Sequence, residues 1–112
     1  MNSKKNCEIV IIGGGIAGSS LAYHLAKLKK TDTILLERHQ LTSGTTWHAA
    51  GLIMQLRSTH TLTDLAKYNV ELYSTLESET GISTGFKQNG TLGVARTKDR
   101  LHETKTIASI AK

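Results

Sequence analysis

The chain has 112 residues, with 14 Lys and Arg against 9 Asp and Glu, one Cys and no Pro, and 38% of its residues are hydrophobic. This length allows one small domain, and a lone Cys cannot form an internal disulfide. No run of about 18 apolar residues is present, so we predict no membrane insertion.

The formal charge of +5 raises the hypothesis of nucleic-acid binding. The basic residues are dispersed, however, and no aromatic residues interleave with them as a platform for base stacking. We therefore predict no nucleic-acid partner and expect the charge to suit an anionic cofactor. The chain starts on a strand-like segment without a signal or transit peptide, so we expect a cytoplasmic protein, with the mitochondrial matrix as the open alternative.

The first predicted elements form a βαβ unit over about residues 6–38. Residues 7–12 are a nearly continuous apolar run rich in β-branched residues, which is typical of a strand in a parallel sheet. A helical stripe of Ala and Leu follows over about 16–29, and 33–36 is predicted to be a second strand. Strand, helix and strand within about 30 residues predict an α/β fold with a right-handed crossover.

A G-x-G-x-x-G motif joins the first strand to the helix. Gly13 permits a tight turn, Gly15 lets the backbone approach a pyrophosphate, and Gly18 lets the helix pack closely on the strand. Glu37 ends the second strand 19 positions after Gly18, where a carboxylate can accept hydrogen bonds from ribose hydroxyls. These features together predict dinucleotide binding, but they do not separate NAD from FAD.

Periodicity weakens over about residues 39–60, which we expect to be a long loop with one helical turn. Its hydroxyl groups at Ser43, Thr45 and Thr46 can donate to phosphate oxygens, and His48 offers a nucleophilic imidazole nitrogen. From composition alone, an ordinary turn-rich surface loop explains this segment equally well.

Residues 61–112 are predicted to hold a helix, a strand and a further helical stretch. Apolar residues at helical spacing predict an amphipathic helix of about 18 residues, which Gly81 ends. Residues 91–95, entered through a turn at Asn89 and Gly90, are predicted to be a strand. The last helical pattern has no closing Gly or Asn, so we expect the chain to be the N-terminal piece of a longer protein.

Five segments carry a specific likeness: the glycine motif, the Leu-Leu-Glu-Arg that ends at residue 38, the Ser-Gly-Thr-Thr-Trp-His-Ala-Ala-Gly-Leu of residues 43–52, and the segments 76–86 and 88–92. In them the chain resembles the sarcosine and dimethylglycine dehydrogenase family of flavoproteins. The likeness covers nearly the whole chain from Cys7, and its Trp-His-Ala-Ala-Gly-Leu portion is the most specific. It implies a Rossmann-like βαβ FAD-binding domain, truncated at the C-terminus.

The resemblance also implies roles for individual residues. FAD would be attached covalently to His48 through the 8α-methyl group of the flavin. The residues implied to contact FAD come from the glycine motif, the end of the second strand and the loop: Gly13, Gly15, Ile16, Ala17, Gly18, Glu37, Arg38, Gly44, Thr45, Thr46, Trp47, His48, Ala49, Ala50, Gly51 and Leu52.

The family oxidises N-methyl groups of small amines such as sarcosine or dimethylglycine. The resemblance therefore implies hydride transfer to the flavin, an iminium that yields formaldehyde or a folate one-carbon unit, and electron-transfer flavoprotein or oxygen as acceptor. A substrate-binding part and a tetrahydrofolate-binding C-terminal part follow this segment in the family. We therefore assign no catalytic acid or base here.

Three alternatives stay open on the sequence. One is a non-catalytic relative that resembles a regulatory subunit of pyruvate dehydrogenase phosphatase, against which His48 argues. Another is an NAD-dependent dehydrogenase, which would have no use for the Trp-His segment. The third is a piece too small to close a core. We predict no metal site, because the other histidines lack paired ligand spacing: His24, His39, His60 and His102.

Overall fold

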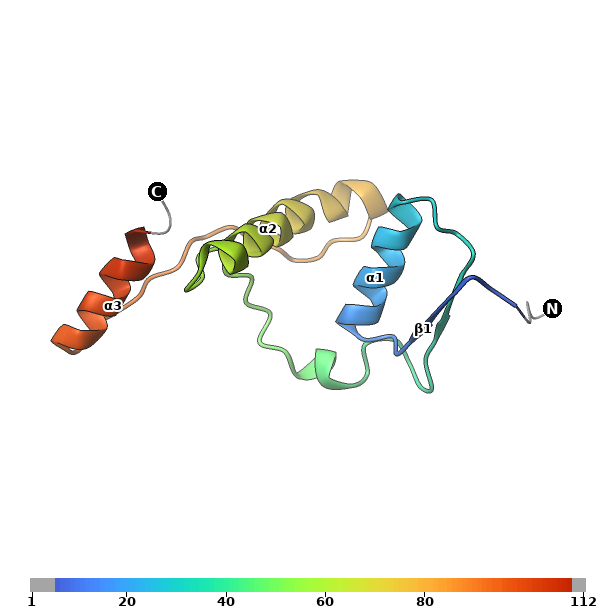
Figure 1. Cartoon of the computed structure of the whole chain (residues 1–112), viewed down its shortest axis with the longest axis horizontal. Coiled ribbons are helices and arrows are strands. Elements are labelled where there is room, and N and C mark those ends of the chain that lie inside the picture. Colours follow the sequence, from blue (N-terminus) through green and yellow to red (C-terminus); the bar gives the residue numbers. More distant parts are fainter. Residues whose placement is uncertain (1–5, 110–112) are drawn as a thin grey trace. The chain divides into compact units, whose positions relative to one another are not determined.

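The computed structural model describes residues 6–109, and Figure 1 shows the order of their elements: β1 (Ile9–Ile12), α1 (Ile16–Lys27), β2 (Thr33–Leu36), the 3₁₀ turn η1 (Thr45–His48), α2 (His60–Thr80) and α3 (Lys98–Ser109). The chain divides into two units, Met1–Gly51 and Leu52–Lys112. The first holds the predicted βαβ arrangement, and the second holds α2 and α3.

The first unit is a parallel pair of strands with α1 packed against both. The register pairs Ile9 with Thr33 and Ile12 with Leu36, so the two strands run in step over their full lengths. The predicted strand at 33–36 agrees with β2, and α1 begins at the predicted residue. Ile11, on the strand beneath α1, is 4% exposed. This unit therefore places the carboxyl ends of both strands beside the beginning of α1.

A non-glycine residue in the left-handed region follows the end of helix α1. Lys29 has φ 59°, its N–H donates to Ala26 O (2.9 Å), and the N–H of Lys30 donates to Leu25 O (2.8 Å). These two bonds form a Schellman motif, which more often has Gly at the left-handed position. The motif satisfies the last carbonyls of α1 and turns the chain back towards β2.

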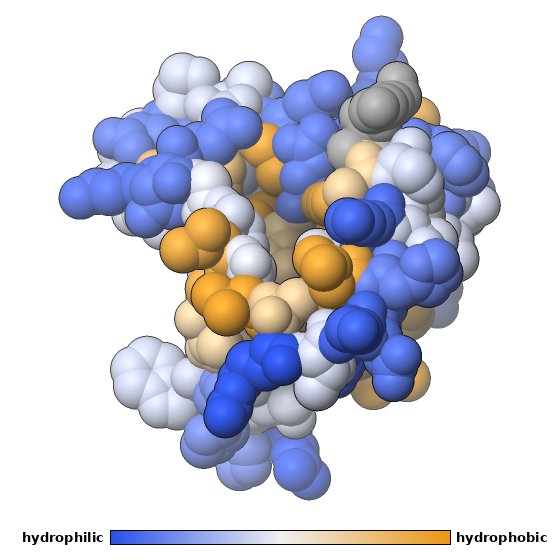
Figure 2. All heavy atoms as spheres, turned by 90° about the vertical axis from the view of Figure 1, so that its left-hand side faces the viewer, coloured by the Kyte–Doolittle hydropathy of each residue, from blue (hydrophilic) through white to orange (hydrophobic). Residues whose placement is uncertain are grey.

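Few hydrophobic side chains are buried within the described residues: the buried ones are Ile11 and Ala66. Ile12 is 86% exposed and Val10 52%, although parallel strands are usually covered on both faces. Figure 2 looks onto the side of Figure 1 on which α3 lies, and hydrophobic side chains are exposed among hydrophilic ones on that face too. The two-stranded sheet thus supports the site geometry without forming a large core of its own.

Helix α2 has well-formed ends. The Oγ1 of Thr59 accepts a hydrogen bond from the N–H of Leu62 (3.3 Å) at its start. Gly81 follows its last residue with φ 72°, and the N–H of Gly81 donates to Glu77 O (2.9 Å). The predicted end of this helix at Gly81 is therefore confirmed, and the physical reason is the left-handed conformation that Gly adopts without strain.

The prediction of a strand at 91–95 is wrong, because the structure has irregular backbone there. A strand is stabilised by hydrogen bonds to a neighbour, and the one sheet within residues 6–109 consists of β1 and β2. Gly90 has the left-handed backbone (φ 79°) that suits the predicted turn, but residues 89 and 90 form neither a turn nor a bend. The chain then enters α3, and Thr97 caps that helix by accepting the N–H of Arg100 (3.2 Å).

The terminal helical pattern is present as α3, and its predicted continuation over 110–112 lies outside the described residues. Within residues 6–109, no helix combines the length and the apolar character that crossing a membrane requires.

Candidate functional site

A cavity of about 420 Å³ lies in the first unit, where the end of β2 and the start of α1 meet the following loop. This is the position outside the carboxyl ends of parallel strands where α/β folds bind their ligands. Its lining comes from three segments of the chain: Gly15, Glu37, Arg38, His39, Thr42, Ser43, Gly44, Thr45 and Thr46.

The structure brings six of the predicted contact residues together in this lining, from the glycine motif, the end of β2 and the loop: Gly15, Glu37, Arg38, Gly44, Thr45 and Thr46. His39 and Thr42 also line it, although the predicted contacts do not include them. The sequence could have indicated His39 and Thr42, because they lie between the predicted residues Arg38 and Gly44.

The glycines of the motif differ in what they make possible. Gly13 has φ 100°, a conformation that side-chain-bearing residues rarely adopt. A Cβ on Gly18 would overlap the carbonyl oxygen of Gly13, so only Gly lets α1 approach the loop this closely. A Cβ on Gly15 would lie 3.1 Å from Thr46 Oγ1. The predicted turn and close packing at the first and third glycines are thus present in the structure.

Glu37 is held at the glycine loop (residues 13–15, between β1 and α1) by backbone hydrogen bonds. Its Oε2 accepts from the N–H of Gly14 (2.7 Å), and its Oε1 accepts from the N–H of His39 (2.9 Å). The bond from Gly14, followed by that from His39, holds the pKa of the Glu37 carboxyl below its ordinary value. The carboxylate is therefore ionised and oriented at the place where the sequence predicts ribose recognition.

The lowered pKa of Glu37 predicts an acid-dependent loss of stability. A carboxyl whose pKa is lower in the folded state stabilises the fold above its unfolded pKa, ordinarily 4.5, and this contribution is lost as the pH falls through the folded pKa. Glu37→Gln should therefore flatten the decline of the denaturation midpoint below about pH 4.5. Chemical denaturation between about pH 3 and pH 6 measures this effect.

Glu71→Gln is the matched control, because Glu71 is an exposed carboxylate on α2. It removes one negative charge without touching the two backbone bonds of Glu37, so it separates their effect from that of the net charge. Equal slopes for the wild type and Glu37→Gln would contradict the assignment of this effect to the two backbone bonds.

Thr46 attaches the loop to the beginning of α1. The N–H of Ile16 donates to Thr46 Oγ1 (2.9 Å), across 30 positions of sequence. Gly15, the N-cap residue of α1, makes no side-chain capping bond. A hydroxyl from the loop therefore caps the helix end that faces the cavity.

The predicted contacts after Thr46 lie outside the cavity lining. Trp47, 79% exposed, and His48, also exposed, complete η1. Ala49, Ala50 and Gly51 are exposed, and Leu52 belongs to the second unit.

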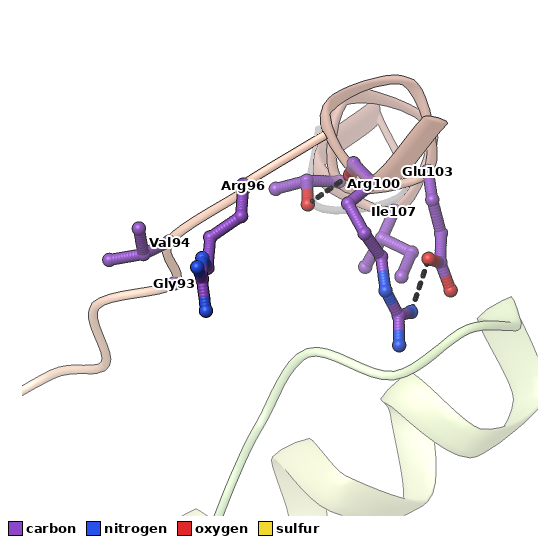
Figure 3. A pocket seen from close by; sticks show the side chains of 7 residues that line it. Gly93, Val94, Arg96, Arg100, Glu103 and Ile107 are labelled. Atoms are coloured by element: carbon purple, nitrogen blue, oxygen red, sulfur yellow. Dashed lines mark hydrogen bonds and ion pairs between the residues drawn. The ribbon is translucent and has the colours of Figure 1, made fainter. Parts of the chain in front are cut away.

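A second cavity, of about 440 Å³, lies beside α3 in the second unit. Figure 3 shows the side chains of Arg96 and Arg100 in this pocket, and Arg100 Nη1 pairs with Glu103 Oε2 at 2.6 Å. No predicted site residue lines it. Within residues 6–109, no group of three or more His, Cys, Asp or Glu side chains is placed to hold a metal ion.

Comparison with known proteins identifies the family of this chain. Residues 8–111 match the family described as FAD dependent oxidoreductase. The chain belongs to this family. The expectation of an FAD-dependent oxidoreductase family is thereby confirmed, and an NAD-dependent dehydrogenase is not favoured.

Several relatives of this family member are enzymes named for N-methylated amino acids. It is 51% identical over 94 residues to 4-methylaminobutanoate oxidase (formaldehyde-forming) of Paenarthrobacter nicotinovorans, which covers 84% of this chain and 11% of that protein. It is 48% identical over 106 residues to human mitochondrial sarcosine dehydrogenase, and the matched segment covers 94% of this chain and 12% of that protein. It is 47% identical over 102 residues to mitochondrial dimethylglycine dehydrogenase of Rattus norvegicus, and the matched segment covers 91% of this chain and 12% of that protein.

A regulatory protein also matches. The mitochondrial pyruvate dehydrogenase phosphatase regulatory subunit of Mus musculus is 43% identical over 102 residues, covering 91% of this chain and 12% of that protein. The chain thus spans 11–12% of the length of these curated relatives. Similarity over this segment establishes the family and the relation to the sarcosine and dimethylglycine dehydrogenases.

Proposed function

We propose that the chain is the FAD-binding portion of an amine oxidoreductase that oxidatively demethylates a small N-methylated amino acid. The observation that carries the proposal is the cavity at the glycine loop, which joins a turn free of side chains to an ionised Glu37 and a row of hydroxyls. The substrate class is supported by the names of the relatives, because sarcosine, dimethylglycine and 4-methylaminobutanoate are all N-methylated amino acids.

The residues of the cavity fit an FAD molecule. The backbone N–H groups at the beginning of α1 suit a pyrophosphate, because the helix dipole is positive there. Glu37 suits the ribose hydroxyls, and Arg38 beside it adds positive charge to the same lining. The hydroxyl of Thr45 is a further donor to phosphate oxygens.

We extend the proposal to the whole predicted contact set, including the residues of 47–52 that lie outside this cavity. FAD, when bound, supplies the hydride-accepting ring, while the protein binds it, orients it and adjusts its potential. His48 is the proposed point of covalent attachment, and its exposed imidazole on η1 is accessible for that bond. An attached flavin cannot dissociate, which suits an enzyme that turns over many times.

The wider protein is part of the same proposal. Its substrate is a small N-methylated amine, its electron acceptor is electron-transfer flavoprotein or oxygen, and tetrahydrofolate is a cofactor of a further C-terminal part. The proposed compartment is the cytoplasm, with the mitochondrial matrix as the alternative that the names of two relatives support.

The intact mass of the denatured protein, isolated from its source, tests this proposal. We expect the polypeptide mass plus one FAD, together with a flavin absorption spectrum. Sarcosine, dimethylglycine or 4-methylaminobutanoate should bleach that spectrum anaerobically, and glycine, which has no methyl group to lose, is the matched control. Flavin that is released on denaturation would remove the covalent bond from the proposal, and a protein that never contains flavin would overturn it.

A further inference from the structure

The backbone N–H of Ile16 has two possible acceptors, the Thr46 hydroxyl and a phosphate oxygen of the proposed cofactor. The N–H groups in the first turn of a helix have no acceptor within the helix. In the proposed function the N–H of Ile16 donates to the pyrophosphate. In this structure the same N–H donates to Thr46 Oγ1 at 2.9 Å. Gly15 leaves the room for this bond, since a Cβ there would lie 3.1 Å from the same oxygen. A phosphate oxygen and the Thr46 hydroxyl therefore exclude each other at this donor.

Glu37, the other side chain that accepts a hydrogen bond from the backbone here, is held more strongly than Thr46. Glu37 Oε2 accepts the N–H of Gly14 at 2.7 Å, and the negative charge strengthens that bond. The acceptor at Ile16 is a neutral hydroxyl, so its bond is the weaker of the two. An anionic phosphate is a better acceptor than a hydroxyl, and it therefore displaces Thr46 rather than Glu37.

The loop has the parts that such a displacement needs. The N–H of Thr42 donates to Gly14 O (2.9 Å), which anchors the loop on the other side of the cavity. Gly44 lies between this anchor and η1, and nothing within 4 Å surrounds the position of its missing Cβ. Residues beyond Gly44 can thus move while the loop stays attached at Thr42.

We propose that Thr46 is a displaceable placeholder: it occupies the Ile16 N–H until a pyrophosphate takes that donor, and its release frees η1. This inference rests on the proposed function, because it takes the pyrophosphate of a dinucleotide as the ligand. η1 carries Trp47 and His48. Cofactor entry and the movement of His48 are then one coupled event, and the histidine is released only after the phosphates are in place.

Hydrogen exchange at the Ile16 amide tests the placeholder in the ligand-free chain, independently of any cofactor. Thr46→Val should speed this exchange about 2- to 30-fold, the range that corresponds to the loss of a helix cap. Thr46→Ser keeps the hydroxyl and should retain protection. Thr45→Val is the matched control and should leave the exchange unchanged. Thr45 lies on the same turn, but the Ile16 N–H donates to Thr46 and not to Thr45. An unprotected Ile16 amide in the wild type would overturn the inference.

The fluorescence of Trp47 tests the displacement. It is the only Trp of the chain, it follows Thr46 directly, and it is 79% exposed. ADP is the probe, because it has the pyrophosphate but no flavin ring to absorb the emission, and AMP is its control. We expect saturating ADP to change the wild-type emission towards that of ligand-free Thr46→Val, and AMP to have a much smaller effect.

Two negative outcomes are distinguishable. ADP that binds by calorimetry without changing the Trp47 emission would overturn the placeholder alone. The absence of ADP binding would overturn the dinucleotide site itself, and the placeholder with it.

Discussion

His48→Ala should release all of its FAD when the protein is denatured in acid, whereas the wild type should keep the flavin on the polypeptide. The effect is all or none, because the proposed bond joins the flavin to a single imidazole nitrogen and Ala offers no nucleophile. Binding before denaturation should persist, since the cavity at the glycine loop is lined by other residues. Flavin fluorescence of the washed protein precipitate measures the attached fraction.

His60→Ala is the matched control for this experiment. His60 is an exposed histidine at the first position of α2, outside the predicted contact set. It should leave the attached fraction unchanged. Flavin that stays on denatured His48→Ala would assign the attachment to another residue, while the FAD content of the native variant reports whether the site still binds.

Gly18→Ala is the second change for which we expect a large effect. The added Cβ would overlap the Gly13 carbonyl oxygen and come within 3.3 Å of Ile11 Cγ2. The obstacle is backbone, so α1 has to move away from β1 and the glycine loop has to open. Such overpacking costs about 3 kcal/mol, a large part of the stability of a small domain. We expect a lower denaturation midpoint and loss of bound FAD together.

Gly93→Ala is the control, because nothing lies within 4 Å of the Cβ it would add and its backbone is outside the left-handed region. Its denaturation midpoint should match the wild type within experimental error. A wild-type midpoint for Gly18→Ala would show that α1 does not pack on the loop as closely as the structure has it.

Local patterns predicted most of the elements of this chain. The apolar run of β2 and the stripe of α1 form because their signals lie within a few neighbouring residues. Gly81 ends α2 for the same reason, since its left-handed backbone depends on its own lack of a side chain. The predicted strand at 91–95 is absent, because a strand depends on a distant partner that local composition does not reveal.

The candidate site divides along the same line. The sequence by itself determined the glycine motif, the acid at the end of β2 and the hydroxyl-rich loop, because each is a property of residue type and short spacing. The tertiary structure alone decided that Glu37 accepts from Gly14 and that Thr46 caps Ile16, 30 positions away. These hydrogen bonds join residues that are far apart in the sequence. They depend on the tertiary packing that brings the loop beside the start of α1, and no local sequence pattern reveals that packing.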